Sequence, residues 1–335
     1  MLSRAKIDLS LMVDTMKAAA ESSRLRILLL LSRGDLTVSD LTEIMNQSQP
    51  RVSRHLKLLL EAALIERYQE GSWAYFRLSD LEGARQFILG LVNRVDTNDP
   101  QIDRDLERLS AVKQRRRDRA AEYFSANASS WDKIRTLHAP DRNVEGKLLE
   151  MAGDRPIHFM LDLGTGTGRL LEIFSDHYRR AIGVDLSHEM LAIARSNLDQ
   201  AGITHAQVRH GDVYAPPVDR DSSDLVTIHQ VLHYLDEPAI VIKEAARVLR
   251  PGGRLVIVDF APHTHEFLRN DHAHVRLGFS DEQIGEWIVE AGLELAEAAT
   301  IEGKPDEKSD LIVKIWMAQD PRLLIADDQA GTGVA

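Results

Sequence analysis

Residues 161–170 read LDLGTGTGRL, and this stretch near the middle of the chain decides its fold class. The run before the glycines, residues 159–163, is short and mostly apolar, which predicts a buried strand. Gly164, Gly166 and Gly168 then lack Cβ atoms, so a ligand can approach the backbone of this loop closely. Apolar residues at helical spacing follow. The sequence therefore predicts a strand, a glycine loop and a helix whose N-terminus faces a nucleotide-like cofactor.

The glycine spacing helps to choose between two cofactors. The dinucleotide fingerprint is G-x-G-x-x-G, with the pyrophosphate on the helix N-terminus. Here the order is G-x-G-x-G, preceded by Asp162, whose carboxylate would repel a pyrophosphate but suits a cofactor with an ammonium and a sulfonium. LDLGTGTGRL resembles the first motif of class I S-adenosylmethionine (SAM) dependent methyltransferases. The resemblance implies that SAM is the cofactor and that Asp162, Gly164, Gly166 and Gly168 contact it.

Two further carboxylates follow expected strands of the same sheet. Asp185 ends a strand expected at 180–184, where an acidic residue accepts hydrogen bonds from a ribose diol in doubly wound folds. Asp212 follows a strand expected at 206–209 and is suited to the adenine amino group. The other cofactor contacts that we expect are Leu186, Met190, Val213 and His229.

Residues 229–235 read HQVLHYL and follow a strand expected at 224–228. The stretch resembles a hallmark of the methyltransferase family, which implies that His229 lies beside the transferred methyl. His229 and His233 are weak candidates for a catalytic base, since histidine titrates near pH 6.5. A histidine here is more often structural, and methyl transfer can need little beyond alignment of the reactants. The catalytic residue therefore remains unidentified from the sequence.

Composition sets the broad class of the chain. Its 335 residues are enough for two domains, and 44% hydrophobic with 28% charged residues is typical of a soluble globular protein. No apolar run approaches the roughly 18 residues of a membrane span, and the first ten residues lack the apolar core of a signal peptide. We therefore expect a cytoplasmic protein that does not enter a membrane. Without any cysteine, disulfides and thiolate metal sites are excluded.

The net charge of −11 is unevenly distributed. Residues 1–97 hold 13 Lys and Arg against 12 Asp and Glu, so the remaining 28 and 40 place the acidic excess beyond them. A nearly neutral N-terminal region can still carry a local basic face that meets phosphates.

The first hundred residues predict helices, a turn and a hairpin in winged-helix order. A helix expected at 49–62 follows a short one from Ser39, and strands expected at 65–69 and 73–78 form the hairpin. Polar side chains gather toward one side of the longer helix and are suited to base edges or phosphates, with hairpin arginines suited to the adjacent backbone. The predicted DNA contacts are Gln49, Arg51, Ser53, Arg54, Lys57, Arg67 and Arg77.

The stretch SQPRVSRHLKLL, within residues 10–95, resembles the ArsR family of winged-helix regulators. The resemblance implies binding to double-stranded DNA and assembly as a homodimer. Where that family senses metal through paired cysteines, this chain has Thr37 and Ser39, which cannot act as thiolate ligands. We therefore predict no metal site.

A long charged helix is expected at 102–123, and we interpret its basic run, 113–119, as a solvated face. After a helix at 239–249 and a strand at 254–260 comes a segment rich in histidines, for which we favour substrate or cap contact over metal binding. The four histidines are His263, His265, His272 and His274.

The predicted fold is α/β: an N-terminal winged helix-turn-helix domain, a helical linker, and a C-terminal Rossmann-like class I methyltransferase sheet with helices on both faces. The predicted boundaries are 1–97 for the DNA-binding and dimerisation domain, 98–140 for the linker and cap, 141–319 for the SAM-binding domain and 320–335 for a disordered tail.

Two functions fit these motifs. The first is a DNA-binding regulator whose methyltransferase domain modifies a small molecule. The alternative is a non-catalytic repressor of methionine or SAM metabolism that senses SAM or S-adenosylhomocysteine. Both functions need the same cofactor site, so the sequence does not separate them.

Overall fold

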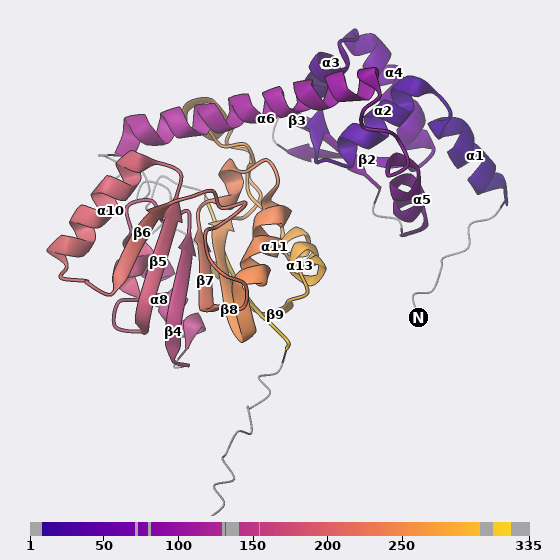
Figure 1. Ribbon diagram of the computed structural model, residues 1–335. Helices are drawn as coiled ribbons and strands as arrows, with labels where there is room; N and C mark the ends of the chain where they lie inside the picture. Colours follow the sequence, from indigo (N-terminus) through magenta and orange to yellow (C-terminus); the bar gives the residue numbers. More distant parts are fainter. Residues whose placement is uncertain are drawn as a thin grey trace, which may run out of the picture. The chain divides into compact units, whose positions relative to one another are not determined.

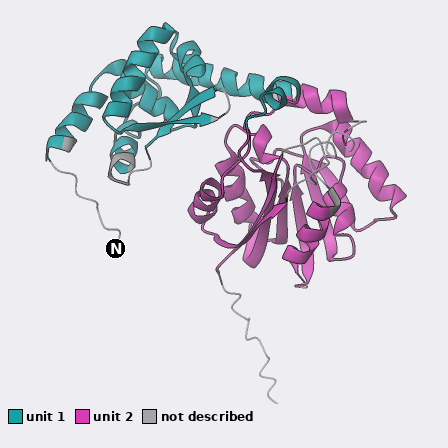
Figure 2. Ribbon diagram, turned by 180° about the vertical axis from the view of Figure 1, so that it is seen from behind, with its two compact units in different colours: residues 1–119, 264–271 teal, residues 120–263, 272–335 magenta. Residues whose placement is uncertain are grey.

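The computed structural model describes residues 9–70, 73–79, 82–128, 131, 141–153, 155–301 and 311–322. The chain divides into two compact units, coloured separately in Figure 2. The first unit comprises residues 1–119 together with 264–271, and the second comprises residues 120–263 and 272–335. Segment 264–271 therefore belongs to the first unit, although the residues before and after it in the sequence belong to the second.

The first unit is mainly helical, with a small antiparallel sheet in the strand order β1-β3-β2 (Figure 1). Its elements are α1 (Leu9–Ala19), α2 (Ser22–Leu31), β1 (Leu36–Thr37), α3 (Val38–Met45), α4 (Gln49–Glu61), β2 (Ile65–Glu70), β3 (Trp73–Leu78), α5 (Glu82–Val92) and the start of α6 (Pro100–Asn127). The predicted order of helix, turn, helix and hairpin is confirmed.

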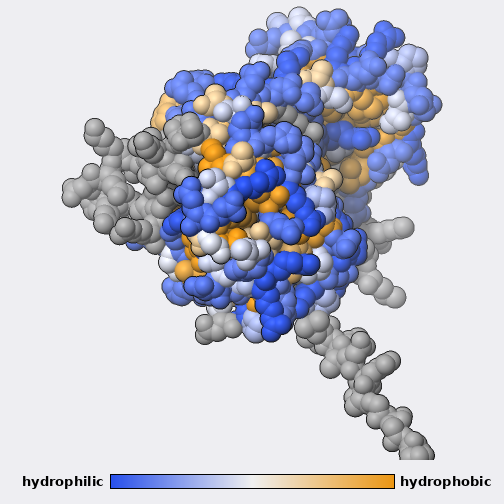
Figure 3. All heavy atoms as spheres, turned by 60° about the vertical axis from the view of Figure 1, so that its left-hand side comes forward, coloured by the Kyte–Doolittle hydropathy of each residue, from blue (hydrophilic) through white to orange (hydrophobic). Residues whose placement is uncertain are grey.

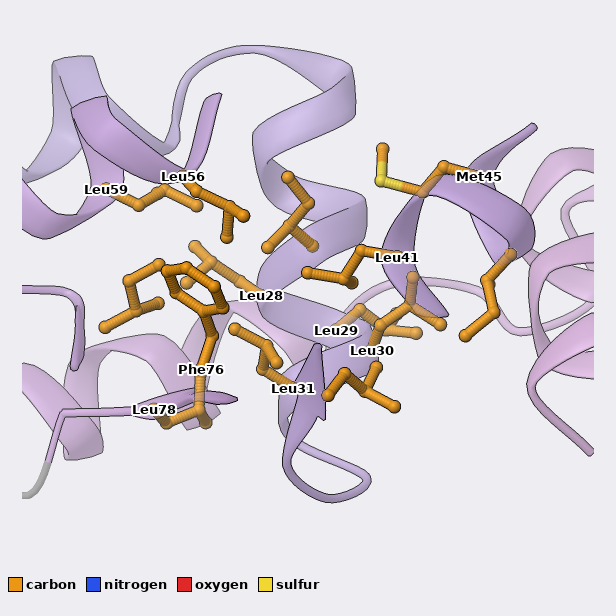
Figure 4. Close-up of a cluster of buried hydrophobic side chains, with 14 of the residues drawn as sticks. Leu28, Leu29, Leu30, Leu31, Leu41, Met45, Leu56, Leu59, Phe76 and Leu78 are labelled. Atoms are coloured by element: carbon orange, nitrogen blue, oxygen red, sulfur yellow. The ribbon is translucent and has the colours of Figure 1, made fainter. Parts of the chain in front are cut away.

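Helix α2 runs through the centre of the first core. Its five consecutive apolar residues from Ile27 to Leu31 are all nearly inaccessible to solvent. They pack against Leu41 of α3, Leu56 of α4 and Phe76 of β3 (Figure 4). Because α3 and α4 both pack on α2, the buried sides of this helix-turn-helix pair share one apolar core.

Helix α3 begins at Val38, one residue before its predicted start at Ser39, because Thr37 caps it. The Thr37 hydroxyl accepts from the backbone of Asp40, and the Asp40 carboxylate accepts from the backbone of Thr37. This reciprocal capping satisfies two backbone donors of the first turn. Thr37, at a position where ArsR-like sensors carry a thiolate, is therefore a structural cap residue here.

The basic run of α6 is not simply a solvated face, as the sequence had suggested. The Arg116 guanidinium donates to the Asp40 carboxylate at 2.8 Å, and the Lys113 ammonium donates to the Arg33 carbonyl at 2.8 Å. Nearer the start of α6, Asp105 is 1% exposed and accepts from Arg26 at 2.5 and 2.8 Å. The N-terminal part of α6 is therefore bonded to the helix-turn-helix core.

The described part of the second unit contains a seven-stranded sheet, mostly parallel and flanked by helices, in the order β6-β5-β4-β7-β8-β10-β9 (Figure 1). Its strands are β4 (Ile157–Leu163), β5 (Tyr178–Asp185), β6 (Ala206–His210), β7 (Ser223–His229), β8 (Leu249–Phe260), β9 (Glu294–Ile301) and β10 (Val313–Gln319). Its helices, after the end of α6, are α8 (Asp141–Ala152), α9 (Arg169–Ile173), α10 (His188–Gln200), η2 (Leu232–Tyr234), α11 (Pro238–Val248) and α13 (Asp281–Glu290), while α12 (Phe267–Asp271) lies in the segment counted with the first unit.

The parallel strands are buried on both faces, which explains their near-continuous apolar sequence. Six of the seven residues of β4 are buried, and Leu161, Val226 and Ile257 of three neighbouring strands belong to one apolar cluster. Strand β10 is antiparallel to both β8 and β9. This layout places the carboxyl ends of β4 to β8 at one edge of the sheet.

Strand β8 begins at Leu249, five residues before its predicted start, because Leu249 pairs with Ser223 across a register shift. The face shown in Figure 3 is mostly hydrophilic, with hydrophobic residues gathered in small patches. None of the helices in the described ranges combines the length and hydropathy that a membrane span requires.

Candidate cofactor site and nucleic-acid interface

The glycine loop lies where the sheet changes direction of winding. From β4 the chain adds β5 and β6 on one side, then crosses to add β7 and β8 on the other. Ligands of doubly wound sheets bind outside the carboxyl ends of the strands at such a switch point. The predicted cofactor residues follow β4, β5, β6 and β7, so the structure brings them to this one edge.

All three loop glycines have left-handed backbone conformations, with φ of 73° at Gly164, 52° at Gly166 and 83° at Gly168. A Cβ on Gly164 would overlap the Val231 side chain, while one on Gly168 would lie 3.2 Å from Ala194 Cβ. Gly168 also precedes the first turn of α9. Glycine at these positions is therefore required by backbone conformation and, at Gly164, by space.

Asp162 is 2% exposed and accepts a hydrogen bond from the Thr227 hydroxyl at 2.6 Å. Burial raises the pKa of Asp162 to about 6, although the Thr227 hydrogen bond opposes the rise. A buried carboxylate with a raised pKa is stabilised in its charged form by a cation. The site can therefore bind an ammonium group through Asp162.

Asp185, at the end of β5, organises the glycine loop. Its carboxylate accepts from the Gly166 backbone at 2.8 Å and from the Ser187 backbone at 2.9 Å. Burial raises the pKa of Asp185, and these backbone hydrogen bonds act in the opposite direction. Beside it, Leu186 is 53% exposed and Met190 is 1% exposed, so Leu186 is the more accessible of the two predicted adenine contacts.

The remaining predicted cofactor residues lie at the carboxyl ends of β6 and β7, on the same edge of the sheet. Asp212 is half-buried and accepts from the Tyr214 backbone at 2.9 Å, with buried Val213 beside it. His229 is half-buried at the end of β7, beside the loop in which Val231 faces Gly164. Their roles in cofactor binding stay predictions.

The other catalytic candidate, His233, is deeply packed. It is 2% exposed, and its Nδ1 lies 2.7 Å from the Asp259 carboxylate. Its ring stacks on His274 with centroids 4.1 Å apart. Asp259 also accepts from the Phe260 backbone, so the dyad joins η2 to the end of β8. These contacts favour a structural role for His233.

Two of the four histidines of the segment after β8, His263 and His274, contact the same Phe260 ring, while His265 lies beside Phe267. His272 Nδ1 is bonded to the Tyr123 hydroxyl at 2.6 Å, His263 lies edge-on to Phe260, and His274 stacks on His233. Within the described ranges, no three His, Cys, Asp or Glu side chains meet in a group that could hold a metal ion.

Three contributors to the site were missed from the sequence. A Cβ on Gly183, inside β5, would overlap the Thr165 side chain, so this glycine makes room for the loop. A glycine inside a strand is a signal for such close approach. Arg169 of α9 pairs with Glu145 of α8 through two hydrogen bonds of 2.8 Å, a contact that no local pattern signals.

Helix α4, the predicted DNA-contacting helix, has an exposed polar side and a buried apolar side, as predicted. Gln49, Arg51, Ser53, Arg54 and Lys57 are all exposed. The opposite side of the helix is buried through Val52, Leu56 and Leu59. The predicted DNA contacts on α4 are therefore available to a partner, while the apolar stripe fixes the helix to the core.

The two hairpin arginines are not brought together. Arg77 stands opposite Glu66 in the β2–β3 register and bonds to its carboxylate at 3.0 Å, whereas Arg67 stands opposite Phe76. Because side chains alternate along a strand, Arg67 and Arg77 project from opposite faces of the hairpin. Arg67 is exposed and Arg77 is half-buried, so Arg67 is the more accessible.

A further contact of the hairpin escaped prediction. Within the first unit, the Arg269 guanidinium lies over the ring of Trp73 at 5.0 Å and over that of Tyr75 at 5.7 Å. Arg269 is 4% exposed, and its carbonyl accepts from Arg119 at 3.0 Å. The segment that contains Arg269 thus packs on strand β3 of the β2–β3 hairpin, which we call the wing. The contact joins residues nearly 200 positions apart in the sequence.

Together, the switch-point glycine loop and the exposed polar side of α4 place a doubly wound α/β domain and a helix-turn-helix unit in one chain. The family model described as a methyltransferase domain matches residues 161–257, and that of the bacterial regulatory protein arsR family matches residues 21–67.

The chain is 32% identical over 197 residues to a malonyl-[acyl-carrier protein] O-methyltransferase of Hahella chejuensis, covering 56% of this chain and 67% of the relative. It is 30% identical over 151 residues to the uncharacterised methyltransferase YcgJ of Bacillus subtilis, covering 42% of this chain but only 58% of that protein. The fold of the N-methyltransferase NodS of Bradyrhizobium japonicum, solved with S-adenosylhomocysteine, is similar with a TM-score of 0.50 and 18% identity, over 61% of this chain and 99% of NodS. The chain belongs to the methyltransferases and also carries an ArsR-family helix-turn-helix domain.

Proposed function

We propose that the protein is a DNA-binding regulator whose methyltransferase domain binds SAM and methylates a small molecule. The observation that carries the proposal is the convergence of Asp162, the three loop glycines and Asp185 at the switch point of the sheet. The NodS structure, which contains S-adenosylhomocysteine, supports SAM as the cofactor.

In this proposal each group of residues contacts a different part of the cofactor. Asp162 accepts the ammonium of the methionine moiety, the backbone of the glycine loop lies against the cofactor, and Asp185 accepts from the ribose hydroxyls. Leu186, Met190, Asp212 and Val213 surround the adenine. When bound, SAM supplies the electrophilic methyl group, and the protein excludes water and aligns the acceptor beside His229.

Isotope transfer tests the enzymatic part of the proposal. The full-length protein is incubated with SAM carrying a deuterated methyl group and a small-molecule extract, and products are identified by mass spectrometry. We expect a labelled product that is lost with Gly166→Arg, which fills the glycine loop. Gly202→Arg is the matched control, because Gly202 also has a positive φ, 69°, but a Cβ there meets nothing within 4 Å. Label transfer that survives Gly166→Arg would contradict the site.

The second candidate function is sensing of SAM or S-adenosylhomocysteine without turnover. One observation favours it: residues 264–271, from the chain between β8 and α13, belong to the first unit and place Arg269 on the wing. Helix α6 likewise begins in the first unit and ends in the second. A ligand that changes either segment can shift DNA affinity, with typical coupling of about 1–3 kcal/mol.

Fluorescence anisotropy with a labelled duplex from the gene's own promoter distinguishes the two functions. Sensing predicts that saturating S-adenosylhomocysteine changes duplex affinity about fivefold or more at fixed salt. Arg269→Ala should reduce this change without altering affinity for the nucleoside ligand. Unchanged DNA affinity across the titration excludes sensing, and a labelled methyl product then leaves the enzymatic function standing.

A further inference from the structure

We propose that the methyl acceptor is an aromatic molecule, bound against a wall of four aromatic side chains beside the glycine loop. This wall consists of Tyr123, Phe124, Trp131 and Tyr234. The inference rests on the proposed methyltransferase function and names the substrate class of the same site.

The wall is continuous with the cofactor loop. Trp131 Nε1 lies 3.7 Å from the position that a Cβ on Gly166 would occupy, so the indole reaches the loop that is expected to hold SAM. Phe124 contacts this indole with ring centroids 5.2 Å apart and contacts Tyr234 at 4.7 Å. The rings therefore lead from the loop after β4 to η2, which follows β7.

The rings of the wall differ from those of a closed core in exposure, while the buried Phe174 and Phe279 also make edge-to-face contacts. Phe124 meets both Trp131 and Tyr234 at 69°, and Tyr123 meets Trp131 at 80°, so the rings meet edge to face. All four side chains are half-buried, in contrast to the fully buried Phe174 and Phe279 of the same unit. Aromatic pairs prefer edge-to-face or offset arrangements, and partly exposed rings leave edges and faces against which another ring can pack in this way.

The polar groups at this wall are mostly engaged with one another. The Tyr123 hydroxyl is bonded to His272 at 2.6 Å, and Asp259 is bonded to His233 beneath Tyr234. A flat, largely apolar acceptor can contact the wall without separating these pairs. A strongly charged acceptor would lose its hydration at this wall, where these polar groups are already bonded to each other, and its binding would therefore be unfavourable.

Isothermal titration of the full-length protein, saturated with S-adenosylhomocysteine, tests the proposal with two matched probes. The first is 2-naphthol, and the second is decahydro-2-naphthol, which has the same skeleton and hydroxyl but no π system. We expect 2-naphthol to bind at least about fivefold more tightly. Equal affinities would overturn the aromatic assignment and indicate a merely apolar surface.

Phe124→Leu removes the central ring while keeping apolar bulk, and we expect it to weaken 2-naphthol about fivefold and decahydro-2-naphthol by less than twofold. The matched control is Trp287→Leu, which removes a half-buried ring of α13 that contacts Phe279. Equal weakening of 2-naphthol by the two variants would overturn the proposal. Normal S-adenosylhomocysteine binding by Phe124→Leu shows that the variant is folded.

The outcomes also separate this inference from the proposed function. Binding of S-adenosylhomocysteine without any binding of 2-naphthol overturns the aromatic acceptor alone. Failure to bind S-adenosylhomocysteine overturns the proposed function, and the inference that depends on it falls too.

Discussion

The glycine loop and the recognition helix are built in opposite ways. At the loop, two nearly buried carboxylates and three positive-φ glycines bond or pack within the protein before any ligand arrives. On α4, five polar side chains project from a helix that is anchored by its other side. Substitutions at the loop should therefore change stability together with binding, whereas substitutions on α4 should change binding alone.

The largest expected effect is at Gly164. Gly164→Ala combines a positive φ with overlap between the new Cβ and Val231, and we expect the free energy of unfolding to fall by about 3 kcal/mol. Urea denaturation measures the change. Gly202→Ala is the control, because it shares the positive φ without a neighbour within 4 Å and should cost about 1 kcal/mol. Equal losses at both glycines would show that space at Val231 is unimportant.

The next effect is the pH dependence of cofactor binding. Because the pKa of Asp162 is raised to about 6, its carboxyl is mostly protonated at pH 5 and mostly ionised at pH 7.5. The charged form is the one that attracts an ammonium, so affinity should rise with pH. We expect S-adenosylhomocysteine to bind about tenfold more tightly at pH 7.5 than at pH 5, with little change above pH 7.

Isothermal titration at several pH values measures this dependence. Asp162→Asn should bind more weakly and lose the rise between pH 5 and pH 7. The variant retains the nearby histidines, so a slope that persists in it belongs to them and removes Asp162 from the explanation.

On the DNA side, we expect a smaller and more local effect. Arg54 is exposed on α4 and is predicted to contact DNA, so Arg54→Ala should weaken promoter binding about fivefold. Its unfolding free energy and its affinity for S-adenosylhomocysteine should not change. Glu61→Ala, at the exposed end of the same helix, is a control that should not weaken DNA binding. Loss of cofactor affinity in Arg54→Ala would contradict the contrast between the two regions.

The contrast also explains what the sequence could predict. The glycine loop and α4 are local patterns: spacing within ten residues predicts the loop, and apolar residues three or four positions apart predict which side of the helix is buried and which is exposed. Carboxylates at strand ends were found because parallel strands end at one edge. These features need no knowledge of which distant segments meet.

Contacts between distant segments could not be found in this way. The Arg26–Asp105 pair, the packing of Arg269 on Trp73 and the space that Gly183 leaves for Thr165 each join separate segments. The basic run of α6 was misjudged for the same reason, since a charged helix face looks solvated until its partner on α3 is known. At β8, the strand was predicted to start only at residue 254, but the pairing of Leu249 with Ser223 starts it five residues earlier.

The smallest expected effect separates the two hairpin arginines. Arg67 is exposed, whereas Arg77 projects from the opposite face and is bonded to Glu66. We expect Arg67→Ala to weaken binding to a generic 30-base-pair duplex about threefold. The slope of log affinity against log salt should then become shallower by about one, as for the loss of one phosphate contact.

Arg77→Ala is the matched variant, and its affinity should stay within about twofold of the wild type with an unchanged salt slope. Removing Arg77 leaves Glu66 without this ion pair, but partly exposed pairs contribute only about 0–1 kcal/mol, so the hairpin should remain folded. If instead Arg77→Ala reduces the slope and Arg67→Ala does not, the other face of the hairpin meets the phosphates. The wing would then approach DNA through the side on which Arg77 and Glu66 lie.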